Sequence, residues 1–101
     1  MITDIPKLAK AKINQVDPSA EIYLFGSRAR KDHKKDSDWD FLILTENEVD
    51  QNLKNRVTDE LFEIELETGQ GLSSIIQNKS EWYELNDTPV YQNISKDSIR
   101  I

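Results

Sequence analysis

Apolar residues near the start of the chain recur with the spacing of one face of a helix. They are Ile5, Leu8, Ala9, Ile13 and Val16. Thr3 or Asp4 can cap the helix N-terminus, with Pro6 in the first turn, and Asp17-Pro18 interrupts the pattern. The sequence therefore predicts an amphipathic first helix.

Two short apolar runs follow, and each has the length and composition of a buried strand. The first is Glu21–Phe25, which ends at Gly26, and the second is Trp39–Leu44, which contains Asp40. Ser27–Arg30 can begin a short helix between them, and Lys31–Ser37 is too polar for a core. We expect the two strands to carry the residues of interest.

The segment from Val49 to Thr68 fits two patterns. Leu61–Leu66 partly alternates like a strand, whereas Leu53, Val57, Leu61 and Ile64 follow helical spacing. We favour a helix because the helical series is longer and begins earlier, and because Gly69 and Gly71 stand where a helix stop belongs. Leu72–Gln77 is then a third strand.

The last quarter of the chain predicts short elements. Ser80 can cap a helical turn at Glu81–Leu85, and Asn86–Pro89 is typical of a turn. Val90–Ser95 predicts a last helical turn before an edge segment at Ile99–Ile101. A chain of this length, 1–101, is expected to form one domain.

Composition excludes several kinds of chemistry. The chain has no Cys and one His, which excludes disulfides, thiol nucleophiles and Cys-based zinc sites. Thirteen basic and nineteen acidic residues give a net charge of -6, which disfavours general nucleic-acid binding. No apolar stretch has the length of a signal peptide or a membrane span, so we expect a cytoplasmic protein without a membrane partner.

The candidate site combines Gly26-Ser27, a gap of ten residues, and the pair Asp38 and Asp40. A glycine after a strand allows a sharp turn, so a phosphate can approach the backbone amides of Ser27 and Arg28 at a helix N-terminus. Residues two apart in a strand point to one face, so Asp38 and Asp40 should converge while Trp39 points away. Two adjacent carboxylates suit Mg2+, which binds one or two carboxylates together with substrate phosphates.

These residues resemble the signature of the minimal nucleotidyltransferases in the DNA polymerase beta-like superfamily. The resemblance implies an α/β (α+β) fold with a small mixed sheet of three to four strands and helices packed on one side. It also implies that Asp38 and Asp40 are catalytic and ligate the metal ions, and that Gly26 and Ser27 bind ATP or another nucleoside triphosphate. In two-metal chemistry one ion activates the attacking hydroxyl and the other stabilises the leaving pyrophosphate.

The chain departs from this family in one respect. The family places a third carboxylate on the third strand, but Leu72–Gln77 offers only Ser73 and Ser74 there. The acids Glu63, Glu65 and Glu67 could supply it only if Leu61–Leu66 were the strand. Nucleotide and metal binding are therefore better supported than turnover.

A basic cluster lies between the two halves of the motif and has two interpretations. Its members are Arg28, Arg30, Lys31, His33, Lys34 and Lys35. One interpretation is a solvated face, which is the usual role of charge runs. The other is an electropositive surface that attracts polyphosphate or an acidic acceptor. In the second interpretation Arg28 and Arg30, nearest Ser27, contact the phosphates.

The resemblance implies a Mg2+-dependent enzyme that moves a nucleoside monophosphate, AMP from ATP, onto a hydroxyl acceptor. The chain has no room for an acceptor-binding domain, so the expected acceptor is a protein, and small family members pair with a helical HEPN-type toxin. The alternative is a non-catalytic nucleotide- or partner-binding antitoxin that lost the third acid. A small-molecule transferase ranks lower, because its substrate pocket would need additional chain.

Overall fold

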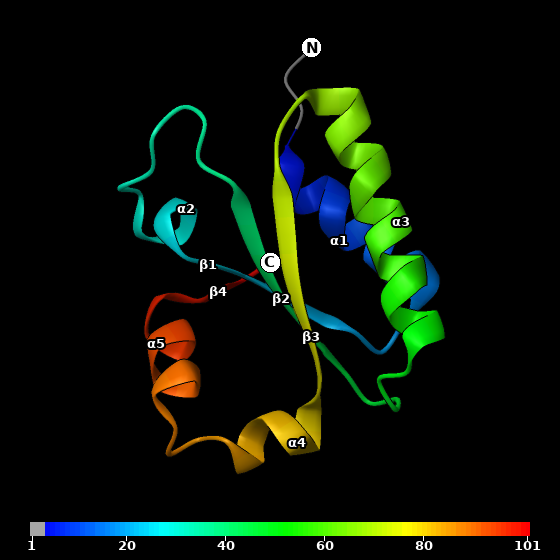
Figure 1. Ribbon diagram of the computed structural model, residues 1–101, viewed down its shortest axis with the longest axis vertical. Coiled ribbons are helices and arrows are strands. Elements are labelled where there is room, and N and C mark those ends of the chain that lie inside the picture. The colour runs from blue at the N-terminus through cyan, green and yellow to red at the C-terminus, as the bar shows by residue number, and fades with distance from the viewer. Residues whose placement is uncertain (1–3) are drawn as a thin grey trace.

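The computed structural model describes residues 4–101 and contains a four-stranded mixed sheet (Figure 1). Its strands are β1 (Glu21–Phe25), β2 (Trp39–Thr45), β3 (Leu72–Asn78) and β4 (Ile99–Arg100). Their spatial order is β3-β2-β1-β4, with β2 parallel to β3 and β1 antiparallel to both of its neighbours. The parallel pair requires a crossover connection, and the helix α3 provides it.

The two long helices are α1 (Ile5–Val16) and α3 (Gln51–Thr68). Asp4 caps α1 by accepting a hydrogen bond from the Lys7 amide at 3.2 Å, whereas Thr3, the other candidate cap, lies outside the described residues. Asp50 caps α3 in the same way, and α3 ends at Gly69 in the left-handed conformation. The helical interpretation of the segment up to Thr68 is therefore confirmed.

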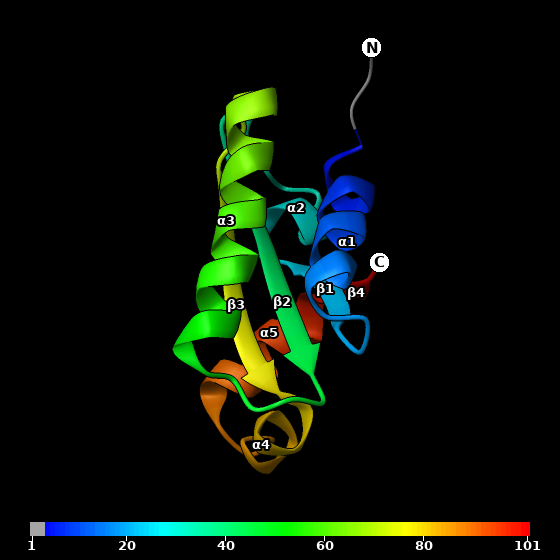
Figure 2. The ribbon, with the colours of Figure 1, turned by 90° about the vertical axis from the view of Figure 1, so that its right-hand side faces the viewer.

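The sheet is covered on both faces, which explains why every residue from Phe41 to Thr45 in β2 is buried. Figure 2 shows α1 and α3 on one face, where they pack against Phe41 and Ile43. On the opposite face Leu42 and Leu44 pack with Trp82 and Ile94 from two shorter helices. The predicted small mixed sheet is confirmed. The expectation that helices pack on one side of it holds only for α1 and α3, because α4 and α5 cover the opposite face.

The remaining helices are short and follow the sequence interpretation with two changes. They are α2 (Ser27–Arg30), α4 (Lys79–Glu84) and α5 (Pro89–Asp97). The expected Ser80 cap is wrong, because β3 runs directly into α4 and the Asn78 side chain accepts from the Ser80 and Glu81 amides. The last helix is longer than one turn, since Thr88 caps it and Pro89 occupies its first position.

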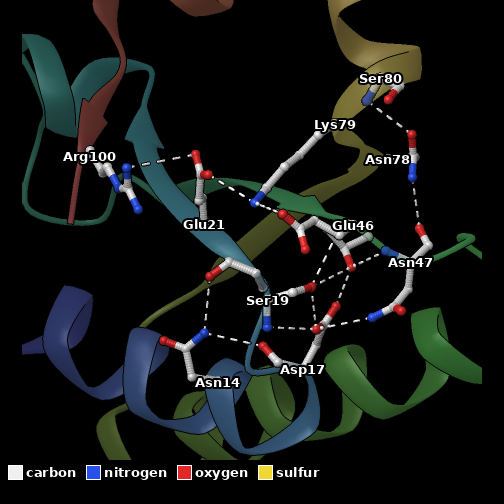
Figure 3. Close-up of polar contacts among 12 residues, drawn as sticks. Asn14, Asp17, Ser19, Glu21, Glu46, Asn47, Asn78, Lys79, Ser80 and Arg100 are labelled. Atoms are coloured by element: carbon white, nitrogen blue, oxygen red, sulfur yellow. Dashed lines mark hydrogen bonds and ion pairs between the residues drawn. The ribbon is translucent and has the colours of Figure 1, made fainter.

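A buried polar cluster joins the loops at the end of the sheet away from Gly26 (Figure 3). Asp17 is only 4% exposed and accepts hydrogen bonds from Thr45 Oγ1, from Ser19 Oγ at 2.7 Å and from Asn47 Nδ2 at 3.2 Å. Burial raises the pKa of Asp17, but these hydrogen bonds outweigh it and leave the pKa below its ordinary value. The cluster therefore stabilises the fold through an ionised carboxylate.

Among residues 4–101, no helix combines the length and apolar character needed to cross a membrane.

Candidate functional site

The two aspartates of the motif lie where β2 begins, close to the end of β1. Asp40 is opposite Phe25 of β1 and opposite Ser73 of β3 in the sheet register. Because side chains alternate along a strand, Asp40 shares its face with Leu42 and Leu44, the face that α4 and α5 cover further along. Trp39 packs on the opposite face with α1 and α3, as the spacing predicts.

Two glycines make room for the two carboxylates. Gly26 has φ +76°, and a Cβ atom built on it would lie 2.5 Å from Asp40 Oδ2. A Cβ atom on Gly71 would overlap Asp38 Oδ1. The Gly26-Ser27 turn therefore sits directly beside Asp40, which brings the two halves of the motif together. Gly71, expected only to end a helix, instead allows the close approach of Asp38.

Ser73 is the third polar side chain of the site. The sequence analysis noted it only as a residue that stands where the family has a carboxylate. Its hydroxyl donates a hydrogen bond to Asp40 Oδ1 at 2.5 Å. The register confirms that Ser73 stands beside Asp40 on the third strand. Glu63, Glu65 and Glu67 belong to α3 instead, so none of them supplies a third carboxylate from a strand.

The donor set can be tested against the expected Mg2+. Within residues 4–101, neither Asp38 nor Asp40 forms an ion pair, and no three or more of Asp, Glu, His and Cys gather in a metal-binding group. Two carboxylates without a cationic partner fit Mg2+, which takes its remaining ligands from water and substrate phosphates. They do not form a complete protein cage for a metal ion.

Arg28 turns away from the two aspartates. Its guanidinium lies 4.4 Å from the centre of the Trp39 ring, on the opposite side of β2 from Asp40. It also donates to the Ser37 carbonyl at 2.9 Å and to the Lys35 carbonyl at 3.3 Å. These contacts fix the end of the loop that leads into Asp38, so Arg28 stabilises the loop rather than contacting the carboxylates.

Arg30 remains beside the glycine turn, although acidic neighbours engage it. It forms ion pairs with Asp32 at 3.0 Å and Asp97 at 3.1 Å. The hydrogen bond to Asp32, followed by that to Asp97, raises the pKa of Arg30. The other basic residues of the cluster, Lys31, His33, Lys34 and Lys35, are exposed in the loop.

A hollow of about 400 Å³ lies between the Gly26 turn and α5. Asn93 and Lys96 from α5 line it together with Gly26 and Arg30. Sequence reasoning did not find these two side chains, because only the tertiary packing of α5 brings them near the turn. A larger hollow of about 620 Å³ lies on the other face, lined by Arg28, Trp39 and Glu67 among others.

Comparisons with known proteins concern the family and the fold. The sequence matches the nucleotidyltransferase domain family over residues 6–101, whereas a comparison with curated proteins finds no match. A chain of a toxin–antitoxin complex crystallised with AMP-PNP has the same fold, with a TM-score of 0.67, 14% identity, and coverage of 94% of this chain and 70% of that one.

Two further complexes contain similar chains. One is a mutant of the toxin–antitoxin MntA-HpeT (TM-score 0.63, 16% identity, 99% of this chain and 72% of that one). The other is the tri-AMPylated Shewanella oneidensis HEPN toxin with its MNT antitoxin (TM-score 0.55, 16% identity, 94% and 70%). At these identities the likeness concerns the fold. The sequence match, in contrast, begins at Pro6 and runs to the last residue, so the chain belongs to the nucleotidyltransferase domain family.

Proposed function

We propose that this protein transfers AMP from ATP, with Mg2+, to a hydroxyl group of a helical HEPN-type protein. The observation that supports the proposal is the close approach of the Gly26 turn to Asp40, because a phosphate bound at this turn would lie next to a carboxylate of the motif. Membership of the nucleotidyltransferase family supports the reaction class. The proposed cytoplasmic location follows from the use of ATP.

The reaction assigns a role to each side chain. Asp38 and Asp40 would hold Mg2+, which supplies charge neutralisation for the phosphates when bound. The amide and hydroxyl of Ser27 would hydrogen-bond the triphosphate, and Gly26 leaves its backbone open to approach. The acceptor oxygen forms a bond to the α-phosphorus as the bond to pyrophosphate breaks, and the hydroxyl proton passes to solvent.

The proposed partner rests on the similar folds. One neighbour is a chain from a complex whose HEPN toxin carries three AMP groups, and another comes from a complex crystallised with AMP-PNP. These two complexes favour AMP as the transferred group and a HEPN-type protein as the acceptor. Asn93 and Lys96 at the hollow beside Gly26 are candidate contacts for the nucleotide.

Transfer is tested with ATP labelled at the α-phosphate, Mg2+ and the product of the neighbouring gene as the proposed HEPN-type partner. We expect label on the partner with the wild type and a loss of at least ~100-fold with Asp38→Asn or Asp40→Asn, because each removes one charged ligand. Asp36→Asn is the matched control, since Asp36 is an exposed loop residue two positions before Asp38. Absence of label with the wild type, or equal label with all variants, would refute transfer.

Ser73 favours a second candidate, an antitoxin that acts by contact alone. A serine stands where the family has an acid, and its hydroxyl donates a hydrogen bond to one carboxylate oxygen of Asp40. In that case Asp38→Asn and Asp40→Asn should neutralise the partner as well as the wild type does. Calorimetry with ATP and Mg2+ separates nucleotide binding from this outcome, since a contact-only protein releases no binding heat.

A further inference from the structure

The outer edge of β3 is an unprotected strand edge. Within residues 4–101, β3 pairs only with β2, so its other side presents free backbone groups. Proteins usually protect such edges with charged residues, proline or a bulge, yet Leu72–Asn78 contains no charged residue and no proline. Seven residues is also long for an exposed edge.

The backbone direction of β3 can be derived from one hydrogen bond. The Gly71 carbonyl accepts from the Trp39 amide at 2.9 Å and so faces β2. The N–H and C=O of one strand residue point to the same side and alternate along the strand. Four residues, Leu72, Ser74, Ile76 and Asn78, therefore direct their amides and carbonyls away from β2.

An exposed apolar surface of α3 lies near this edge. Phe62 and Leu66 are 55% and 70% exposed, and Thr58 precedes them at the same four-residue spacing. Lys54 and Thr58 line a hollow of about 370 Å³ together with Ser74, Ile75 and Ile76, which shows that this side of α3 faces β3. Figure 1 shows α3 running alongside β3.

We infer that a second copy of this chain occupies this surface, with β3 pairing antiparallel to β3 of the partner about a two-fold axis at Ile75. In this register the outward-facing Ser74 is opposite the partner's Ile76, and Leu72 is opposite the partner's Asn78. All four outward residues then exchange backbone hydrogen bonds, and no like charges meet. Two copies form one continuous eight-stranded sheet, twice the four strands of the monomer.

The charge distribution of α3 also matches a second copy. Lys54 and Glu65 are eleven residues apart, or about three helical turns, so they lie on one side of α3. No ion pair engages either of them within the described part of the chain. A two-fold axis reverses the partner helix, so Lys54 faces the partner's Glu65 and Glu65 faces the partner's Lys54. An extended peptide from another protein would leave this complementarity unused.

In this dimer, a residue of the second copy would lie next to the candidate site. Across the axis at Ile75, the partner's Gln77 lies opposite Ser73, the residue that hydrogen-bonds Asp40. The inference itself does not depend on catalysis, because it rests on β3 and α3 alone.

The test is the molar mass of the full chain in solution, measured by sedimentation over a range of concentrations. We expect a dimer of twice 11.7 kDa that dissociates on dilution. Ser74→Pro should give a monomer, because proline removes an outward N–H but leaves the bonds to β2 intact. A monomeric wild type at every concentration, or a dimer that survives Ser74→Pro, would overturn the inference.

Charge reversal provides a second test that does not alter the strand. Lys54→Glu and Glu65→Lys should each weaken the dimer at least ~5-fold, and the double variant should restore it. Arg56→Glu is the control, because Arg56 lies two residues from Lys54 and on a different side of α3. Equal dimerisation of all four variants, or no recovery in the double variant, contradicts this register. Thermal melts verify that each variant is folded.

Discussion

Replacing Ser73 by Asp would install the carboxylate that the site lacks. Ser73 lies opposite Asp40 in the register of β2 and β3 and donates a hydrogen bond to it at 2.5 Å. The substitution removes this donor and introduces a third negative charge into the site, directly beside Asp40. Ser73→Asn has nearly the same shape without the charge and is the matched control. The pair therefore isolates the effect of charge at this position.

The structure gives the size of the effect on stability. Two carboxylates ~4 Å apart repel each other by about 1 kcal/mol in water and by more in a lower dielectric. Ser73 is exposed, so the lower figure applies. Loss of the hydrogen bond to the Asp40 side chain adds about 1 kcal/mol. A destabilisation of ~2 kcal/mol lowers the Tm of a domain of this size by roughly 10 °C.

Differential scanning calorimetry measures the Tm of both variants without metal and with Mg2+. Without metal, Ser73→Asp should melt roughly 5 °C below Ser73→Asn, which lacks the charge repulsion. With Mg2+ the order should reverse, because saturating ligand at 100 times its Kd stabilises the folded state by about 2.7 kcal/mol. If the enzyme turns over, a positioned base should also raise AMP transfer by ~100-fold or more. Equal melting of both variants in both conditions would refute the adjacency of these carboxylates.

Three further predictions test the site and the fold. Gly26→Ala should cost at least ~2 kcal/mol in the free energy of unfolding and abolish ATP binding, because its Cβ atom meets Asp40. The control Gly69→Ala, also at positive φ but with open space around it, should cost about 1 kcal/mol and leave ATP binding intact. Equal effects of the two substitutions would contradict the close approach of Gly26 to Asp40. Asp17→Asn should lower stability at neutral pH by about 1 to 3 kcal/mol in urea titrations. Because the pKa of Asp17 is lowered, its contribution to stability is fully present above the ordinary pKa of 3.8 and is lost as the pH falls through the folded-state pKa. The free energy of unfolding should therefore depend less steeply on acidic pH in Asp17→Asn than in the wild type. An unchanged dependence would argue against an ionised Asp17. Phe41→Ala should cost about 3 to 5 kcal/mol by the same titration, because Phe41 is fully buried, and a loss below ~1 kcal/mol would contradict its place in the core.

Local patterns in the sequence predict most of the fold. The helical spacing before Asp17 and from Leu53 to Ile64 identifies both long helices, since each buries one face against the sheet. The same local signals locate the Gly26 turn and the strand that contains Asp40. Local signals are weaker after β3, where the Asn78 carboxamide rather than the Ser80 hydroxyl caps α4. Both residue types are good caps, and the choice depends on where the preceding strand ends.

The direction of Arg28 could not be predicted from its position next to Ser27. A phosphate and an aromatic ring both attract a guanidinium, and sequence distance favours the phosphate. In the folded chain Trp39 and the carbonyls of Lys35 and Ser37 lie on the other side of β2 and hold Arg28 there. The arginine thereby orders the loop before Asp38, which is a positioning role. Arg30, whose side chain stays near the hollow beside Gly26, is the better candidate for a phosphate contact.

The roles of Gly71 and Ser73 depend on strand register, which no local pattern encodes. Parallel pairing of β2 with β3 sets Asp40 opposite Ser73, and it places Gly71 where a side chain would displace Asp38. A shift of β3 by one residue would turn Ser73 to the other face and bring Ser74 toward the site. The conclusion that this site has two acids rather than three therefore follows from the register. Under the proposed function, the two carboxylates would balance the charge of one divalent ion, and the acceptor proton would pass to solvent because no third acid stands on β3.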